Sequence, residues 1–160
     1  MENGFRNIFG MFNANTELVG KTIADIGPED WFRSPGDDSN HLIWVVGHLI
    51  VHRGAVLKLV GIDWNSSWEA LFAPGAKRID HSGCPPIDEM RAAWNDTSAQ
   101  LADSLRQVPS ETLDKPASDG QLSFDKKLSG VVAFYAFHDT YHSGQVSYLR
   151  KWLGYGQTVG

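Results

Sequence analysis

Apolar side chains recur at helical spacing along most of the chain, and this pattern predicts four long helices. The first, over residues 3–26, carries an apolar stripe with spacings of three, four and seven residues. The second, over residues 41–60, is apolar around much of its circumference, which is typical of a deeply buried helix. The third, over residues 87–108, alternates in steps of three and four, as helices in bundles do. The fourth is predicted over residues 126–153.

No segment alternates convincingly like a strand, so the sequence predicts an all-α protein: a four-helix bundle in one domain spanning residues 1–160. The connection from Ile62 to Pro86 is long for a compact domain and has no sustained period. It is either a packed surface loop or a lid over a functional site. Its length leaves room for a crossover in place of simple up-and-down winding. The tail after Gly154 is expected to be loosely ordered.

Composition and charge exclude several classes of protein. The 160 residues are 42% hydrophobic and 21% charged, which suits one soluble domain with a single core. The net charge of −5, with no basic run, argues against nucleic-acid binding through a general basic surface. A single cysteine, Cys84, rules out an intrachain disulfide framework and is compatible with the cytoplasm. We expect neither a signal peptide nor a membrane span.

Histidines are the most informative feature of the sequence. His138 and His142 lie four residues apart on the fourth predicted helix, so both imidazoles can reach one metal ion. On the second helix, His41, His48 and His52 are separated by seven and four residues. At about 100° per residue these three side chains form one stripe. Core packing does not call for such a stripe, because buried imidazoles need hydrogen-bond partners or a metal.

Taken together, His48, His138 and His142 are therefore predicted to form a metal site. Taken singly, the other three histidines are better interpreted as satisfied core residues or surface residues; they are His41, His52 and His81.

Two segments resemble a known family. The second helix contains WVVGHLIVHRG and the fourth contains HDTYHSGQVSYLRKWLG. They resemble the DinB-like (DNA-damage-inducible) superfamily, whose pattern is a histidine after W-x-x-G, and later H-x-x-x-H followed by Gly-Gln, Arg and Gly. Here the pattern falls on Trp44, Gly47, His48, His138, His142, Gly144, Gln145, Arg150 and Gly154. The resemblance covers essentially the whole chain in helix order and length.

The resemblance implies a bundle in which His48, His138 and His142 hold one divalent metal ion, zinc or nickel, often within a homodimer. The superfamily includes metal-dependent thiol S-transferases. Ser143 departs from the family pattern, because arginine is common at that position, and its loss puts recognition of an anionic substrate in doubt. His48 and His52 form another H-x-x-x-H pair on the second helix. His52 is either a fourth ligand, a neighbour of the ligands or an exposed residue.

Three histidine ligands leave an open position on a divalent ion, which is the arrangement of catalytic sites. Such an ion either lowers the pKa of a bound water, as in a hydrolase, or holds a thiol as its thiolate, as in a transferase. The first hypothesis is a transferase whose substrate is a small molecule, with a low-molecular-weight thiol as partner. The alternatives are a non-catalytic or stress-related metal-binding protein and a metal-dependent hydrolase. Residue spacing assigns no catalytic base.

For other residues near the predicted ligands, the sequence gives weaker support for a functional role. Asp139 points about 100° away from the ligand face and is a weak candidate for a general base. Gln145 lies three residues after His142 and is placed to hydrogen-bond a ligand or an imidazole. Tyr141 is interpreted as a core aromatic and Arg150 as a structural ion-pair residue.

Aromatic residues in the long connection, Trp64, Trp68 and Phe72, have two interpretations. They either cover the metal pocket and make it apolar or form a dimer contact. Cys84 has no convincing activating base near it in sequence and is interpreted as incidental.

Overall fold

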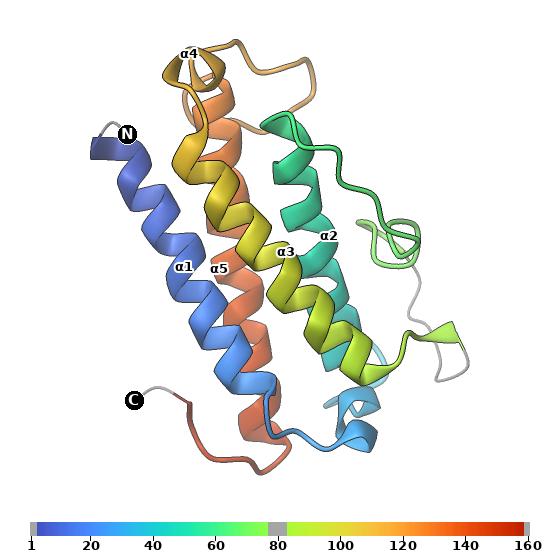
Figure 1. Ribbon diagram of the computed structural model, residues 1–160. Coiled ribbons are helices and arrows are strands. Elements are labelled where there is room, and N and C mark those ends of the chain that lie inside the picture. Colours follow the sequence, from blue (N-terminus) through green and yellow to red (C-terminus); the bar gives the residue numbers. More distant parts are fainter. Residues whose placement is uncertain (1–2, 77–82, 159–160) are drawn as a thin grey trace.

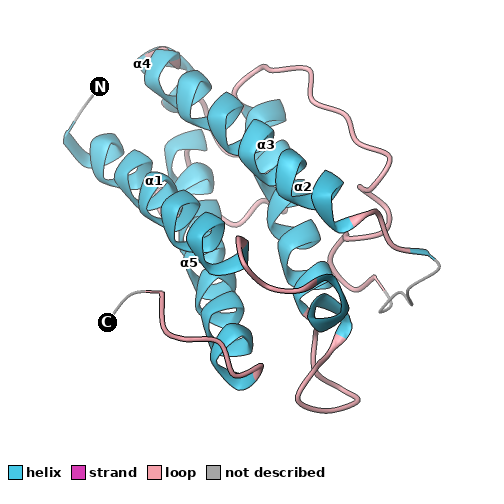
Figure 2. Ribbon diagram, turned by 60° about the horizontal axis from the view of Figure 1, so that its bottom comes forward, coloured by secondary structure: helices cyan, strands magenta, loops and turns pink. Residues whose placement is uncertain are grey.

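The structure is a computed structural model in which residues 3–76 and 83–158 are described. Helices account for all the regular structure of these residues (Figures 1 and 2). The elements are α1 (Asn3–Ile23), the 3-10 helix η1 (Pro28–Phe32), α2 (Leu42–Leu59), α3 (Ile87–Gln107), α4 (Ser110–Leu113) and α5 (Leu128–Trp152). The all-α prediction is confirmed for the described ranges, where the one bridge pairs Pro116 with Lys127 and belongs to no strand.

The four long helices pack in a ring. α1 contacts α5 and α3, and α2 contacts α3 and α5, so the order around the ring is α1, α5, α2, α3. Figure 1 shows α1 and α5 running downward and α2 and α3 running upward. Because α2 and α3 are parallel neighbours, the chain must return along the bundle before α3 can begin. This geometry explains the length of the connection between these two helices.

Two glycines of α2 leave room for the connection between α2 and α3, residues 60–86, which is called the return segment below. A Cβ atom on Gly54 would lie 2.2 Å from the ring of Trp64, and one on Gly47 would lie 2.6 Å from the ring of Phe72. Both rings are buried, and Trp68 packs edge-on against Phe72. The described part of the segment is therefore a packed cover on α2, and only glycine leaves room for these rings.

Periodicity places the end of the first helix slightly too late. α1 ends at Ile23, whereas the apolar pattern continues to Ile26. Ile26 is buried outside the helix, so the pattern reports burial and not backbone conformation. Arg91 of α3 satisfies the carbonyl groups left at this end, because its guanidinium donates to Ile23 O at 3.3 Å and to Ile26 O at 2.7 Å.

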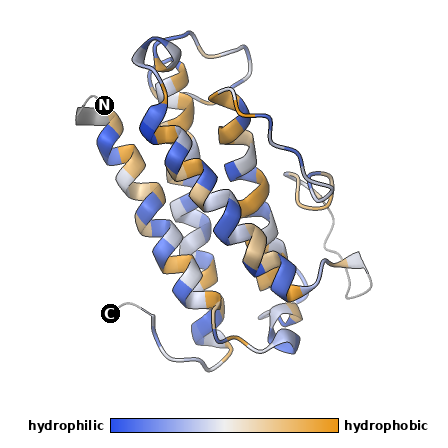
Figure 3. Cartoon of the chain, viewed as in Figure 1, coloured by the Kyte–Doolittle hydropathy of each residue, from blue (hydrophilic) through white to orange (hydrophobic). Residues whose placement is uncertain are grey.

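α2 is the most apolar of the long helices, whereas α1 and α3 alternate between hydrophilic and hydrophobic residues along their length (Figure 3). Within the described residues, Leu42–Leu59 is the one helix long and apolar enough to cross a membrane by length and composition. However, 72% of this stretch is buried inside the protein, as in the core helix of a soluble domain. The prediction of a deeply buried second helix is confirmed.

A buried ion pair links all four long helices. Arg53 of α2 donates from Nε to Asp139 Oδ2 of α5 at 2.8 Å and from Nη2 to Oδ1 at 3.1 Å. Its Nη1 donates to Thr16 of α1 at 2.7 Å and to Ser98 of α3 at 2.6 Å. The guanidinium also lies over the ring of Trp94, with 3.9 Å from Cζ to the centroid. These contacts satisfy two buried charges and fix the relative positions of α2 and α5.

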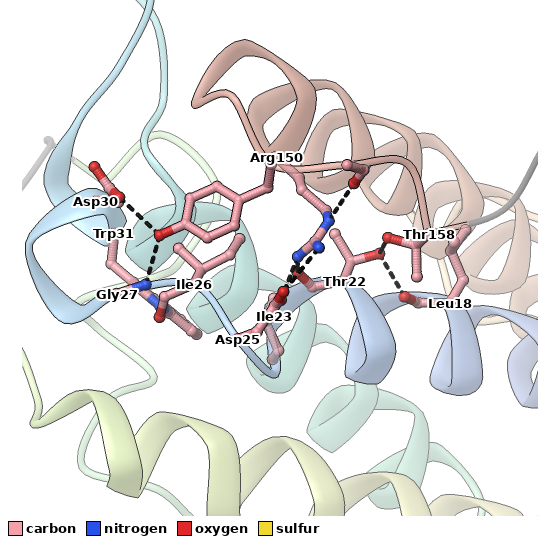
Figure 4. Close-up of polar contacts among 12 residues, drawn as sticks. Leu18, Thr22, Ile23, Asp25, Ile26, Gly27, Asp30, Trp31, Arg150 and Thr158 are labelled. Atoms are coloured by element: carbon pink, nitrogen blue, oxygen red, sulfur yellow. Dashed lines mark hydrogen bonds and ion pairs between the residues drawn. The ribbon is translucent and has the colours of Figure 1, made fainter.

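The C-terminal end of α5 is tied to α1 by Arg150 (Figure 4). The guanidinium of Arg150 binds both carboxylate oxygens of Asp25 and donates to Thr22 O at 2.8 Å and to Gly156 O at 2.7 Å. The hydrogen bond from Arg150 lowers the pKa of the Asp25 carboxyl below its usual value. Arg150 therefore has the predicted structural role.

The described part of the tail is more ordered than the sequence predicts. The Tyr155 hydroxyl donates to Asp30 Oδ2 at 2.9 Å and accepts from the Gly27 N–H at 2.9 Å (Figure 4). The hydroxyls of Thr158 and Thr22 lie 3.0 Å apart. The expectation of a loose tail is wrong for these residues, because side-chain hydrogen bonds hold the tail against α1 and η1.

Candidate metal centre

Three histidines from two helices converge on one point. His48 lies on α2, and His138 and His142 lie one turn apart on α5. Their potential ligand atoms all lie within 4.8 Å of one another. The Nε2 atom of His138 is 3.1 Å from Nε2 of His142 and 3.5 Å from Nε2 of His48. The structure thus brings together the three residues that the spacing singled out.

Hydrogen bonds fix which nitrogen of two rings faces the centre. Nδ1 of His48 is 2.7 Å from the main-chain carbonyl oxygen of Phe72, which can only accept. Nδ1 of His142 is 2.7 Å from Oε1 of Gln145, which also accepts. Both Nδ1 atoms therefore carry the proton, and both Nε2 atoms present a lone pair to the centre. Such outer bonds orient the histidine ligands of metal sites.

Two of the three nitrogen separations are close to those around a tetrahedral cation. In a tetrahedron with metal–nitrogen distances of about 2.0–2.1 Å, two ligand nitrogens lie about 3.3–3.4 Å apart. The 3.1 and 3.5 Å separations at His138 fall on either side of this value. Nδ1 of His138 is buried and has no hydrogen-bond partner among residues 3–76 and 83–158, so within these ranges His138 lacks an orienting bond of the kind that its two neighbours have.

Burial keeps all three imidazoles in the form that binds metals. Burial and the two neighbouring histidines lower the pKa of His138 to about 4. Burial also lowers the pKa of His48 and of His142, against the opposing effect of their hydrogen bonds to Phe72 and Gln145. At neutral pH the three rings are therefore uncharged, as ligation to a cation requires.

His52 packs beside the cluster and lies outside it. Its ring stacks on His138, with centroids 4.3 Å apart and planes 13° from parallel, and lies 4.1 Å from the ring of His48. Burial lowers the pKa of His52 to about 3, and its Nδ1 has no hydrogen-bond partner in the described part of the chain. Of the three interpretations offered by the sequence, the neighbour of the ligands fits this placement.

His41 is not part of the cluster. His41 is buried at the N-terminus of α2, where its Nδ1 accepts a hydrogen bond from the Trp44 N–H at 3.2 Å. It is therefore an N-cap, although serine, threonine, asparagine and aspartate are commoner at this position. His81 lies outside the described residues.

Aromatic rings flank the histidines. Trp44 stacks on His48, with centroids 4.6 Å apart, and meets His142 edge-on at 6.3 Å. Tyr141 is 60% exposed, and its ring meets His142 edge-on at 5.1 Å. The interpretation of Tyr141 as a core aromatic is therefore wrong, and it borders the site. The sequence motif contains Trp44 without assigning it this contact, and its stacking on His48 four residues later follows from their shared helix face.

Trp64 and Phe72 of the return segment neither form an exposed dimer contact nor place their rings over the histidines. Trp64 and Phe72 are buried against α2, so they do not form an exposed dimer patch. Their rings rest on Gly54 and Gly47, and the direct link to the histidines is the Phe72 carbonyl. The segment thus supports the centre from behind His48.

Three charged residues considered for a role at the site, Arg53, Asp139 and Arg150, form ion pairs within the bundle. Asp139 follows His138 but points into the core, where Arg53 binds both of its oxygens. This direction agrees with the 100° offset expected from the sequence and removes Asp139 from consideration as a general base. Arg53 and Arg150 are held in ion pairs with Asp139 and Asp25, so neither is placed to bind an anionic substrate.

The helical ring and its three-histidine cluster define an all-α protein with a candidate metal centre. A family model described as the DinB superfamily matches residues 11–146, which include all three histidines. The chain belongs to the DinB superfamily. No curated protein matches the chain. Family and cluster together are compatible with metal binding.

Proposed function

We propose that this protein is a divalent-metal-dependent enzyme that transfers a small thiol to an electrophilic substrate. The observation that carries the proposal is the convergence of three neutral imidazoles, His48, His138 and His142, which no carboxylate of the described residues joins. Family membership supports a bundle of the DinB type around this centre. Zinc and nickel both suit imidazole ligands.

The chain would contribute three neutral, oriented ligands that leave one position of a bound ion open. A divalent ion held by three neutral ligands keeps its full positive charge and supplies Lewis acidity that favours an anionic fourth ligand. Two of the imidazoles are held in place by the Phe72 carbonyl and the Gln145 amide oxygen. The ring of Trp44 covers His48 and excludes water from that side of the ligand.

A thiol suits this environment better than a water molecule. The carboxylate nearest to the ligands in sequence, Asp139, is committed to Arg53 and is not available to assist hydrolysis. A free thiol, with a pKa of about 8.5, is already far closer to ionisation at neutral pH than free water, with a pKa of about 15.7, and a divalent ion would lower the pKa of either. Small thiols are kept reduced in the cytoplasm, which is where we place this enzyme.

The proposal is tested with cobalt as a spectroscopic probe. Elemental analysis of untagged protein should give about one divalent ion per chain, lost in His48→Ala, His138→Ala and His142→Ala. The cobalt-loaded protein is then titrated with cysteine, glutathione and 2-mercaptoethanol. A near-ultraviolet sulfur-to-cobalt band should appear with at least one thiol, in a Cys84→Ser background that excludes the chain's own thiol.

Transfer of that thiol to a small electrophile should then depend on the metal. A loaded site that gives no thiolate band but hydrolyses esters or amides would favour the hydrolase. A loaded site with neither activity would favour a non-catalytic metal-binding protein. Wild-type protein that takes up neither zinc nor nickel would overturn the metal-centre proposal.

A further inference from the structure

A hollow of ≈ 440 Å³ lies at the end of the bundle where α1 and α5 begin and α3 ends. Figure 1 shows these three helix ends together with α4 at the top of the molecule. The walls come from α1, α3, α4, α5 and the segment that joins α4 to α5. The three clustered histidines are not among the lining residues, so the hollow is separate from the metal centre. Its volume falls within the range of about 300–1,000 Å³ that is typical of sites for small molecules.

Each of these elements contributes an apolar side chain to the lining. Phe5 of α1 and Leu105 of α3 are buried, whereas Phe124, in the segment before α5, is 67% exposed. Three further apolar residues line the hollow: Ile8, Leu113 and Ala133. Because contact between water and these groups is unfavourable, a molecule with an apolar body gains free energy by covering them, above all by covering Phe124.

Charges of both signs line the hollow. Arg106 donates from Nη1 to Asp103 at 2.7 Å, and Asp114 accepts from Lys127 Nζ at 2.7 Å. Asp125 is a second carboxylate of the lining. An anion in the hollow would therefore meet Asp114 and Asp125, and a cation would meet Arg106. An uncharged molecule avoids both repulsions and leaves the existing ion pairs intact.

The carboxylate of Asp125 is already bound by donors of its own segment and of α5. Its Oδ1 accepts from the Lys127 N–H at 2.8 Å and from the Ser123 hydroxyl at 3.2 Å. Its Oδ2 accepts from the Ser129 hydroxyl at 2.7 Å. Because Ser129 gives its proton to Asp125, its oxygen is left to accept a hydrogen bond from a ligand. Ser110 brings a second hydroxyl to the lining.

The segment before α5 holds this lining in a strained conformation. Lys126 has a φ of 62°, a region that glycine adopts far more readily than lysine. Its carbonyl oxygen accepts from the Ala117 N–H at 2.9 Å, which helps to hold the turn. A Cβ atom on Gly130 would overlap the Asp125 carboxylate, so the segment lies directly on the start of α5 only because this residue is glycine. Backbone strain of this kind is concentrated at functional sites.

We infer that the hollow binds a small uncharged molecule that has an apolar body and one hydrogen-bonding group. The body lies against Phe124, Leu113 and Ala133, and the polar group reaches the hydroxyls of Ser110 and Ser129. The inference does not depend on the proposed enzyme activity, because it rests on residues that are not part of the metal centre.

Three molecules of one shape and different charge test the inference. They are naphthylmethanol, which is neutral, naphthylmethylamine, which is a cation, and naphthoate, which is an anion. Each is titrated into the full chain and followed by NMR of methyl groups. The alcohol should bind most tightly and shift the signals of Ile8, Leu113 and Ala133. The methyl signals of Val56, in the core on α2, should stay in place.

Two variants test the location of the site. Ala133→Phe fills the hollow, so the alcohol should no longer saturate the protein at concentrations that saturate wild type. Phe124→Ala removes an exposed ring and keeps the fold, and it should weaken binding of the alcohol by about 2–10-fold, the value of one aromatic contact. Ala99→Phe is the matched control, since Ala99 is exposed on α3 away from the hollow and should leave binding unchanged.

Several results would overturn the inference. They are a wild type whose methyl signals near the hollow do not move with the alcohol, and tighter binding of the amine or of naphthoate than of the alcohol. Unchanged affinity in Phe124→Ala, or in Ala133→Phe with a native urea midpoint, would do the same.

Discussion

The main-chain carbonyl oxygen of Phe72 lies 2.7 Å from Nδ1 of His48. This bond joins a loop that has no repeating pattern to the histidine that the sequence motif marks most clearly. It sets the proton on Nδ1 and leaves Nε2 to face the other two histidines. The orientation of His48 therefore depends on how the ring of Phe72 sits on α2.

The absence of a side chain at Gly47 allows the Phe72 ring to pack on α2, so Gly47→Ala should weaken metal binding. A Cβ atom at this position would lie 2.6 Å from the Phe72 ring, which must move and carry its carbonyl away from His48. Loss of an outer hydrogen bond to a histidine ligand typically reduces metal affinity about 10–100-fold. Competition against a chromophoric zinc chelator measures the change.

Gly54→Ala is the control for this prediction. It should displace Trp64, which would be 2.2 Å from the new Cβ, and so cost stability through overpacking, typically about 1–3 kcal/mol. Its effect on metal affinity should be small, because no hydrogen bond links Trp64 to a clustered histidine in the part of the chain that is described. Equal losses of metal affinity in the two variants would contradict this account of the Phe72 bond.

Arg53 and Asp139 should contribute strongly to stability when either is removed alone. Asp139→Ala leaves a buried guanidinium without its carboxylate, and such unpaired buried charges typically cost about 3–5 kcal/mol. Urea denaturation of metal-free protein measures the loss. Asp103→Ala is a matched control, since its ion pair with Arg106 is exposed and should be worth at most about 1 kcal/mol. A similar small loss in both variants would show that the buried pair is not critical.

The sequence predicts the histidine cluster better than it predicts what supports it. His138 and His142 share a helix face by arithmetic, and a histidine stripe on an apolar helix calls for a partner. The support comes from groups that leave no periodic signal. The carbonyl of Phe72 is backbone and is independent of residue type, and the Arg53–Asp139 pair spans 86 residues of sequence.

For the fold too, the sequence predicts some features and not others. Helical periodicity predicts four helices, with ends that differ by a few residues from the observed ones, because Ile26 is buried beyond the end of α1. Periodicity does not reveal that α2 and α3 are parallel, since direction depends on the path of the connection. Periodicity also does not show that Tyr141 is exposed, because an aromatic residue at helical spacing fits a core and an exposed surface equally well.

Gln145 should tune the metal centre through His142. Its Oε1 accepts the Nδ1 proton of His142 at 2.7 Å, so Gln145→Leu should remove the acceptor and lower metal affinity by about 10–100-fold. Gln145→Glu keeps an acceptor of the same reach with more negative charge, and should preserve or raise the affinity. Isothermal titration with zinc and the visible spectrum of the cobalt form report the change. Unchanged affinity and spectrum in Gln145→Leu would rule out this contribution.

The metal-free protein should lose stability as the pH falls from 7 to 5. Burial lowers the pKa of His52 to about 3 and that of His138 to about 4, both well below the ordinary value of 6.5. Between these values the unfolded chain binds protons that the native chain does not, so the free energy of unfolding decreases as the pH is lowered.

His52→Phe is the variant that tests this pH dependence. Phenylalanine keeps an aromatic ring stacked on His138 but cannot be protonated, so the loss of stability between pH 7 and pH 5 should be shallower than in wild type. Urea midpoints at pH 7, 6 and 5, with a chelator present throughout, provide the comparison. Replacing the exposed Thr140 by valine should leave the wild-type slope unchanged. If His52→Phe also kept that slope, protonation of His52 in the unfolded chain would not be a source of the acid sensitivity.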